Sequence, residues 1–241
     1  MRKAEARLDE QEAFVLHTYP FRETSLVVEA FSRSHGRVAL VARGARRPAS
    51  SFRGLLLSFQ PLLLSWYGKS ELRTLHRAQW QGGRPGLQGM ALICGLYLNE
   101  LLMRFLPRDD AHPGLYSNYS ETLLAMGNHP DLSGILRRFE IDLLNEMGYA
   151  PMLEFDAGSG EPVHAERVYT YELERGPVLD SGSETHAVRL RGKTLLDMAS
   201  GEYSDPVTQQ QSKALMRMLI NHHLGAQPLH TRRLLQDLQK L

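Results

Sequence analysis

The chain has 241 residues, with 28 Lys and Arg against 27 Asp and Glu, and 42% of its residues are hydrophobic. This composition is typical of a soluble globular protein with one large or two modest domains. The single cysteine, Cys94, excludes an internal disulfide and any zinc site built from two or four cysteines. The first residues lack the apolar core of a signal peptide, and no apolar run reaches the roughly 20 residues of a membrane span. We therefore expect a cytoplasmic, nucleoid-associated protein that does not enter a membrane.

The charges are segregated along the chain. The first 80 residues hold 13 basic and 7 acidic residues, whereas the remaining 161 hold 15 basic and 20 acidic residues. No Asp or Glu occurs between Ala30 and Ser70, and the basic residues of this segment are Arg33, Arg37, Arg43, Arg46, Arg47, Arg53 and Lys69. A surface that collects arginine and excludes carboxylates suits a polyanion, because the guanidinium fork pairs with phosphate oxygens. The alternative is a solvated charged face with no partner.

The first third of the chain is predicted to be β-structure. Stretches rich in Val, Leu and Phe, separated by turn residues, predict strands at 13–18, 25–32, 37–43 and about 72–79. A further apolar stretch at 55–66 is divided by Pro61, which indicates an edge strand or a bend. Gly36 is predicted to supply the positive φ of a hairpin turn. Five short strands in some 65 residues predict a small barrel. Between its third and fourth strands we expect a flexible, arginine-containing connection at 44–51.

The clearest boundary is the glycine-rich segment 82–86, which predicts a first domain at 1–81 and a second at 82–241. Beyond it the apolar residues recur with helical spacing. Helices are predicted at 90–106, 116–126, 131–147, 207–224 and, with Thr231 as N-cap, at the end of the chain. Alternation at Tyr169, Tyr171 and Leu173 predicts a small β-hairpin insert within 155–192. The expected fold class is α+β, a small five-stranded barrel followed by a mainly helical domain with this insert.

An ordered series of short motifs spans nearly the whole chain, from about residue 12 to residue 235. The motifs are AFVLH (13–17), ETSL (23–26), GRV (36–38), VARGAR (41–46), GLYLNELL (95–102), LRRFE (136–140), LL (143–144), GY (148–149), LG (224–225) and PL (228–229). The series resembles the RecO recombination mediators of bacterial DNA repair. The resemblance implies an OB-fold amino-terminal domain, a helical carboxy-terminal domain and no catalytic site. It also implies binding of single- and double-stranded DNA, annealing of complementary strands and help in loading the recombinase RecA. The implied partners are RecR and the acidic tail of single-strand DNA-binding protein.

Some members of the family carry a four-cysteine zinc site in the segment that corresponds to residues 156–160. That segment has no cysteine here, and we therefore expect neither zinc nor another cofactor. The adjacent residues His222 and His223 do not restore the site, because adjacent side chains on a helix diverge.

Within the first domain we expect Arg43, Arg46, Arg47 and Arg53 to contact the DNA backbone, with Arg37 and Arg73 as weaker candidates. Phe52, which lies among these basic residues, is the aromatic side chain expected to stack on a base, and Trp66 and Tyr67 lie in the same region. If six arginines each met a phosphate, raising the salt concentration from about 50 to 200 mM would weaken binding on the order of a thousandfold.

The second domain is acidic overall, and an acidic, apolar peptide tail would need a hydrophobic pocket bordered by cations. Candidate cations are Arg137 and Arg138 on the helix at 131–147, and Lys213 and Arg217 one turn apart on a later helix. The family resemblance favours Arg137 as the partner of the tail's carboxylate. The alternative is an arginine paired with Asp142 or Glu140.

Two other functions are open on sequence grounds. Asp109, Asp110 and His112 could form part of a metal-dependent nuclease site, although a second acidic motif is absent and the chain has no Walker A sequence. An RNA-binding OB protein is the other alternative, because phosphate and stacking contacts serve DNA and RNA alike. The helical second domain and the whole-chain resemblance favour DNA repair and a protein that is not an enzyme.

Overall fold

The structure is a computed structural model that describes residues 7–84, 86–129, 131–182, 188–225 and 228–231. The chain divides into two compact units. One runs to Asn128 and takes in the segment from Leu229, and the other spans His129–Pro228. Among the described residues, no helix is long and apolar enough to cross a membrane.

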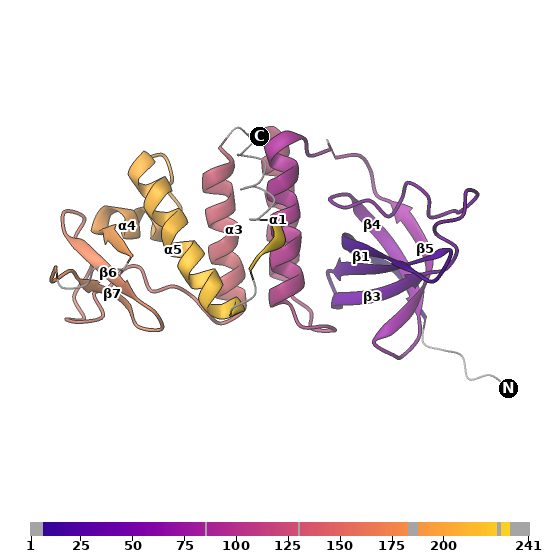
Figure 1. Cartoon of the computed structure of the whole chain (residues 1–241), viewed down its shortest axis with the longest axis horizontal. Coiled ribbons are helices and arrows are strands. Elements are labelled where there is room, and N and C mark those ends of the chain that lie inside the picture. Colours follow the sequence, from indigo (N-terminus) through magenta and orange to yellow (C-terminus); the bar gives the residue numbers. More distant parts are fainter. Residues whose placement is uncertain (1–6, 85, 130, 183–187, 226–227, 232–241) are drawn as a thin grey trace. The chain divides into compact units, whose positions relative to one another are not determined.

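The first unit contains a closed five-stranded barrel (Figure 1). Its strands are β1 (Arg7–Phe21), β2 (Ser25–Ser32), β3 (Gly36–Ala42), β4 (Pro61–Tyr67) and β5 (Leu72–Trp80). Around the barrel they follow the order β1-β2-β3-β5-β4, with β3 and β5 parallel and the other pairs antiparallel. The small barrel predicted from the strand spacing is confirmed, and so is the OB-fold that the family resemblance implies. The stretch predicted at 55–66 is a strand only from Pro61, since proline cannot donate to a ladder and is tolerated as the first residue of a strand.

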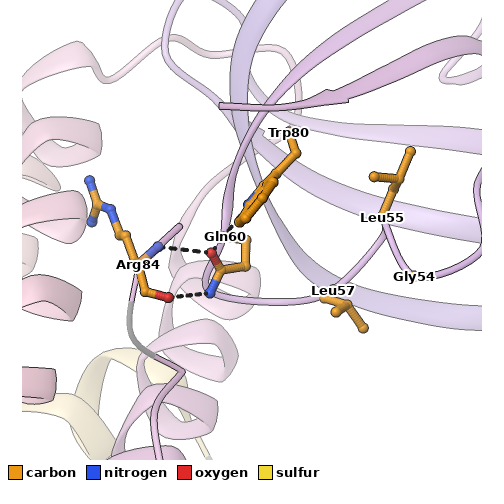
Figure 2. Close-up of a pocket in the computed structure, with 6 residues that line it drawn as sticks. All are labelled: Gly54, Leu55, Leu57, Gln60, Trp80 and Arg84. Carbon is orange, nitrogen blue, oxygen red and sulfur yellow. Dashed lines mark hydrogen bonds between the residues drawn. The ribbon is translucent and has the colours of Figure 1, made fainter. Parts of the chain in front are cut away.

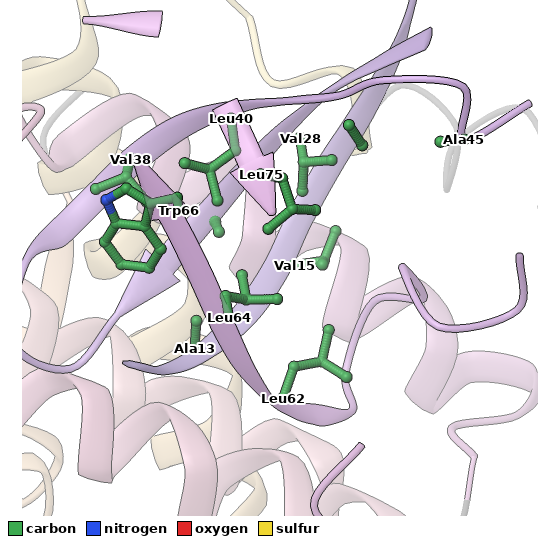
Figure 3. Close-up of a cluster of buried hydrophobic side chains, with 12 residues drawn as sticks. Ala13, Val15, Val28, Val38, Leu40, Ala45, Leu62, Leu64, Trp66 and Leu75 are labelled. Atoms are coloured by element: carbon green, nitrogen blue, oxygen red, sulfur yellow. The ribbon is translucent and has the colours of Figure 1, made fainter. Parts of the chain in front are cut away.

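Alternate residues of the strands point inward and fill the barrel (Figure 3). The inward set is almost completely buried and consists of Ala13, Val15, Val28, Ala30, Val38, Leu40, Ala42, Leu62, Leu64, Trp66 and Leu75. Trp66 is only 1% exposed in this core. It therefore contributes to stability and does not offer a ring to a nucleobase.

Two helices, α1 (Gly89–Phe105) and α2 (Pro113–Asn128), belong to the same unit as the barrel. The buried amide of Asn99 donates to the Leu16 carbonyl at 2.8 Å, which joins α1 to β1. The ring of Phe14 meets that of Tyr119 edge-on, with the centroids 5.2 Å apart, which joins β1 to α2. Because of these buried contacts, the first compact unit includes α1 and α2 and is larger than the predicted domain 1–81.

The segment from Leu229 returns to this unit through Glu100 of α1. The carboxylate of Glu100 accepts hydrogen bonds from the backbone N–H groups of His230 and Thr231, at 2.8 and 2.9 Å. Burial alone would raise the pKa of Glu100, but these bonds and the guanidinium of Arg104 hold it below its usual value. The predicted final helix lies, beyond Thr231, outside the described residues.

The second unit contains α3 (Leu132–Glu146), α4 (Gly192–Ser200) and α5 (Pro206–Leu224). Its small sheet has the order β7-β6-β8, from β6 (Val168–Glu172), β7 (Gly176–Leu179) and β8 (Arg189–Arg191). The predicted hairpin is confirmed as β6–β7. The apolar pattern of the sequence does not indicate β8 or α4, which are short elements of 3 and 9 residues.

Candidate nucleic-acid interface

The segment of residues 43–60 between β3 and β4, here called the basic loop, is built from successive turns. The backbone N–H groups of Arg47, Ser50 and Arg53 donate to carbonyls three residues earlier, at 3.0, 3.1 and 3.1 Å. On its inner side, Ala45, Phe52 and Leu56 pack against the barrel core. The side chains on its outer side are therefore presented from a loop that is fixed to the barrel.

Four of the predicted DNA-binding arginines, Arg43, Arg46, Arg47 and Arg53, are exposed on this loop. Among the described residues none of them forms an ion pair with a carboxylate. Arg46 and Arg53 each donate one Nη1 bond, at 3.2 Å, to the backbone carbonyls of Glu23 and Pro48. Because a carbonyl is neutral, these bonds orient the guanidinium groups without cancelling their charge.

The basic loop is tied to the turn between β1 and β2. The backbone N–H of Arg46 donates to the Thr24 carbonyl at 2.9 Å, next to the bond that its side chain makes with Glu23. The same turn carries one exposed cation and one exposed carboxylate, Arg22 and Glu23, so it adds no net charge.

Two of the predicted contacts, Arg37 and Arg73, do not belong to this exposed set. Arg37 lies 3.9 Å from Glu29, and Arg73 forms an ion pair of 2.6 Å with Asp109. Their side chains are only 18% and 17% exposed, and Arg108 also donates to Glu29. Carboxylates therefore compensate both cations. Arg73, through Asp109, helps to hold the segment after α1 against the barrel, whereas Arg37 and Glu29 both belong to barrel strands. The phosphate contacts of these two arginines stay a prediction, which their compensated charges do not favour.

The stacking role of Phe52 stays a prediction. Phe52 is half-buried, because it packs against the barrel core, and this burial limits the ring surface that it can offer. Tyr19 is 42% exposed and pairs with Val27 across the β1–β2 ladder. The centroid of its ring lies 4.4 Å from that of the His17 ring. Burial and the nearby Glu29 raise the pKa of Tyr19, so its phenol is neutral and adds no negative charge. Tyr19 lies outside the strand predicted at 13–18, whereas β1 continues to Phe21.

The candidate cations of the second unit also divide into a buried, ion-paired residue and exposed residues. Arg137 is buried and forms an ion pair of 2.6 Å with Glu140, which is the alternative that the sequence analysis had left open. Arg138 is exposed, but its Nε donates to the Gly201 carbonyl at 3.0 Å. Lys213 and Arg217 are exposed on α5 and have no carboxylate partner among the described residues.

The residues considered for a nuclease site have neighbours of their own. Asp109 forms an ion pair with Arg73, and a carboxylate oxygen of Asp110 lies 3.5 Å from the Nε2 of His112. In the described part of the chain, no group of three or more His, Cys, Asp or Glu residues could hold a metal ion.

The comparison with known proteins covers both units. Residues 7–84 match the family model described as Recombination protein O N terminal, and residues 87–233 match Recombination protein O C terminal. The chain belongs to the RecO family. Proteins named DNA repair protein RecO from Nitrosospira multiformis and Aromatoleum aromaticum are 57% and 55% identical, each alignment covering 98% of both chains. The RecO of an Azoarcus species is 53% identical over the same share. The chain is thus a DNA repair protein of the RecO family, as its motif series predicts.

Proposed function

We propose that this RecO protein is a non-enzymatic DNA-binding protein that binds single- and double-stranded DNA through the basic loop, anneals complementary strands and assists the loading of RecA together with RecR. The observation that carries the proposal is the set of four exposed arginines on a loop fixed to an OB barrel, without carboxylate partners among the described residues. The names of its relatives support the DNA repair context.

Annealing by such a surface is a physical process. Two single strands repel each other through their phosphates, and cations that neutralise both backbones let the strands approach. Base pairing then supplies the free energy, so neither nucleotide hydrolysis nor a metal or other cofactor is required. Contacts to phosphate carry no sequence information, which suits a protein that must act on any complementary pair.

The acidic tail of single-strand DNA-binding protein is the proposed partner of the second unit. Lys213 and Arg217 lie one turn apart on α5 and can pair with carboxylates of the tail. Arg137 is not proposed for this role, because Glu140 already compensates its charge.

The test is a fluorescence assay for the annealing of complementary DNA strands in EDTA, with naked strands and with strands coated by single-strand DNA-binding protein. We expect annealing in both cases. Each phosphate contact contributes about 0.7 log unit to single-strand affinity near 0.1 M salt, so Arg46→Ala with Arg47→Ala should weaken binding roughly 25-fold. The annealing rate at limiting protein should fall with it. A matched control, Arg175→Ala with Arg189→Ala, removes two exposed guanidinium groups from the second unit and should anneal like the unchanged protein.

Three outcomes would contradict the proposal. Failure to anneal naked and coated strands would remove the mediator function. Tighter binding to RNA than to DNA of the same sequence and salt would indicate the RNA-binding alternative. Mg²⁺-dependent cleavage that is lost in Asp109→Ala with Asp110→Ala would indicate the nuclease.

A further inference from the structure

Trp80, the last residue of β5, exposes a large aromatic side chain next to the basic loop. Its side chain is 57% exposed, in contrast to the buried Trp66. Trp80 lines a hollow of about 290 Å³ whose other residues are Gly54, Leu55, Leu57, Gln60 and Arg84 (Figure 2). Four of these, Gly54, Leu55, Leu57 and Gln60, come from the basic loop. The hollow is thus continuous with the loop that presents the uncompensated arginines.

The indole ring is held in place although it is exposed. Its Nε1 donates to the Gln60 Oε1 at 3.4 Å, and Gln60 in turn donates to the Arg84 carbonyl at 3.3 Å (Figure 2). A Cβ added at Gly83 would lie 3.3 Å from a carbon of the ring, so the backbone there passes close to the indole. A ring fixed in this way loses little conformational freedom when another flat ring stacks on it.

The rim of the hollow is apolar with a cation beside it. Leu57 is 57% exposed, while its neighbour Leu56 points inward to the barrel core. Arg53 directly precedes Gly54, and its guanidinium donates to the Pro48 carbonyl and has no carboxylate partner among the described residues. An apolar, aromatic-walled hollow next to an uncompensated cation matches one ligand chemistry well, a flat nucleobase attached to a phosphate backbone.

We propose that the hollow lined by Trp80, Leu55 and Leu57 binds an unpaired nucleobase of single-stranded DNA whose phosphates contact the basic loop. This inference rests on the proposed function and adds to it a base-stacking site that distinguishes single strands from duplex. In a duplex the bases are already stacked and paired, so only the phosphate contacts remain.

The test compares oligo(dT) with a duplex of equal length, by fluorescence anisotropy at fixed salt. Stacking on one aromatic side chain is worth about 5- to 150-fold in affinity by alanine substitution, so Trp80→Ala should weaken oligo(dT) binding within that range. Duplex binding should change by less than about twofold, because paired bases do not reach the ring. Trp80→Phe should restore most of the affinity, whereas Trp80→Leu, which is apolar but not aromatic, should behave like Trp80→Ala.

A second measurement does not depend on the alanine variant. Oligo(dT) should quench the tryptophan fluorescence of the unchanged protein, and the quenching should disappear in Trp80→Phe, which retains only the buried Trp66. Thermal denaturation midpoints of the variants, compared with that of Leu124→Ala at another exposed apolar position, report whether the fold is kept.

The outcomes separate this inference from the proposed function. Unchanged oligo(dT) affinity in Trp80→Ala, or no quenching of Trp80, would overturn the inference and leave DNA binding through the basic loop intact. Full binding by Trp80→Leu would also overturn it and would indicate that the hollow receives an apolar segment of a protein partner. No binding of oligo(dT) by the unchanged protein would overturn both.

Discussion

The buried carboxylate of Glu29 compensates the charges of two neighbouring arginines, Arg37 and Arg108. This carboxylate is only 4% exposed, accepts a hydrogen bond from Arg108 and lies 3.9 Å from Arg37. A buried charge is tolerated when partners compensate it, and removing one partner leaves the others uncompensated. The segment after α1 is therefore attached to β2 by an ion-pair cluster that is separate from the basic loop.

We expect Glu29→Ala to lower the free energy of unfolding by about 3–5 kcal/mol, because it leaves two partly buried guanidinium groups without their carboxylate. Urea denaturation measures this change, and Glu23→Ala, an exposed carboxylate on the neighbouring turn, should stay within about 0.5 kcal/mol of the unchanged protein. A loss below about 1 kcal/mol for Glu29→Ala would contradict a structural role for the cluster.

At this scale the sequence predicted the exposed arginines of the basic loop but not the ion-paired ones. The absence of carboxylates between Ala30 and Ser70 describes neighbours along the chain only. The partner of Arg73 is Asp109, which belongs to the segment after α1 and which folding brings to β5. The pairing of Arg137 with Glu140 could be anticipated, because residues three apart on a helix are neighbours. The exposure of Trp80 could not, since an apolar residue at the end of a strand can lie on either face.

At the scale of elements, the turn between β2 and β3 lies against the segment after α1. Gly36 has φ +64°, and a Cβ at this position would overlap the carbonyl oxygen of Asp110. The backbone N–H of Asp109 also donates to the Arg37 carbonyl at 3.0 Å. Gly36 is thus required both for the turn, as its predicted positive φ indicates, and for the close approach of this segment.

Gly36→Ala and Gly54→Ala separate these two requirements. Both positions have positive φ, which costs an alanine about 1–2 kcal/mol, but a Cβ at Gly54 meets nothing within 4 Å. We expect Gly36→Ala to destabilise the protein by at least about 2 kcal/mol more than Gly54→Ala, because the backbone at Asp110 must also move. The difference in thermal midpoint between the two variants measures this effect, and equal midpoints would contradict the close approach.

Most of the elements could be predicted because their apolar residues repeat with a clear period. Strands β2, β3 and β5 and helices α1, α2, α3 and α5 lie close to the predicted ranges. Strand β1 runs from Arg7 to Phe21 and extends beyond the predicted 13–18 at both ends. The start of β4 at Pro61 follows from a hydrogen-bonding rule that the apolar pattern of 55–66 does not express. The helix α4 has only 9 residues, so its pattern covers too few turns to stand out.

At the scale of the whole molecule, the arginines of the segment without carboxylates divide into ion-paired residues and exposed residues of one loop. Of the six arginines between Ala30 and Ser70, Arg33 pairs with Glu12 at 3.0 Å and Arg37 lies beside Glu29. The four that remain are those of the basic loop. The sequence could indicate the OB barrel and a polyanionic partner, but only the fold shows how many of these charges are available to it.

The salt dependence of oligo(dT) affinity tests this count most directly. Four phosphate contacts predict a slope of log K against log salt of about −2.8, which is a loss of roughly 50-fold between about 50 and 200 mM salt. Arg46→Ala with Arg47→Ala should bring the slope to about −1.4, while Arg37→Ala should leave it unchanged. A slope near zero, or a slope that the double substitution does not alter, would contradict the claim that the basic loop binds the DNA backbone.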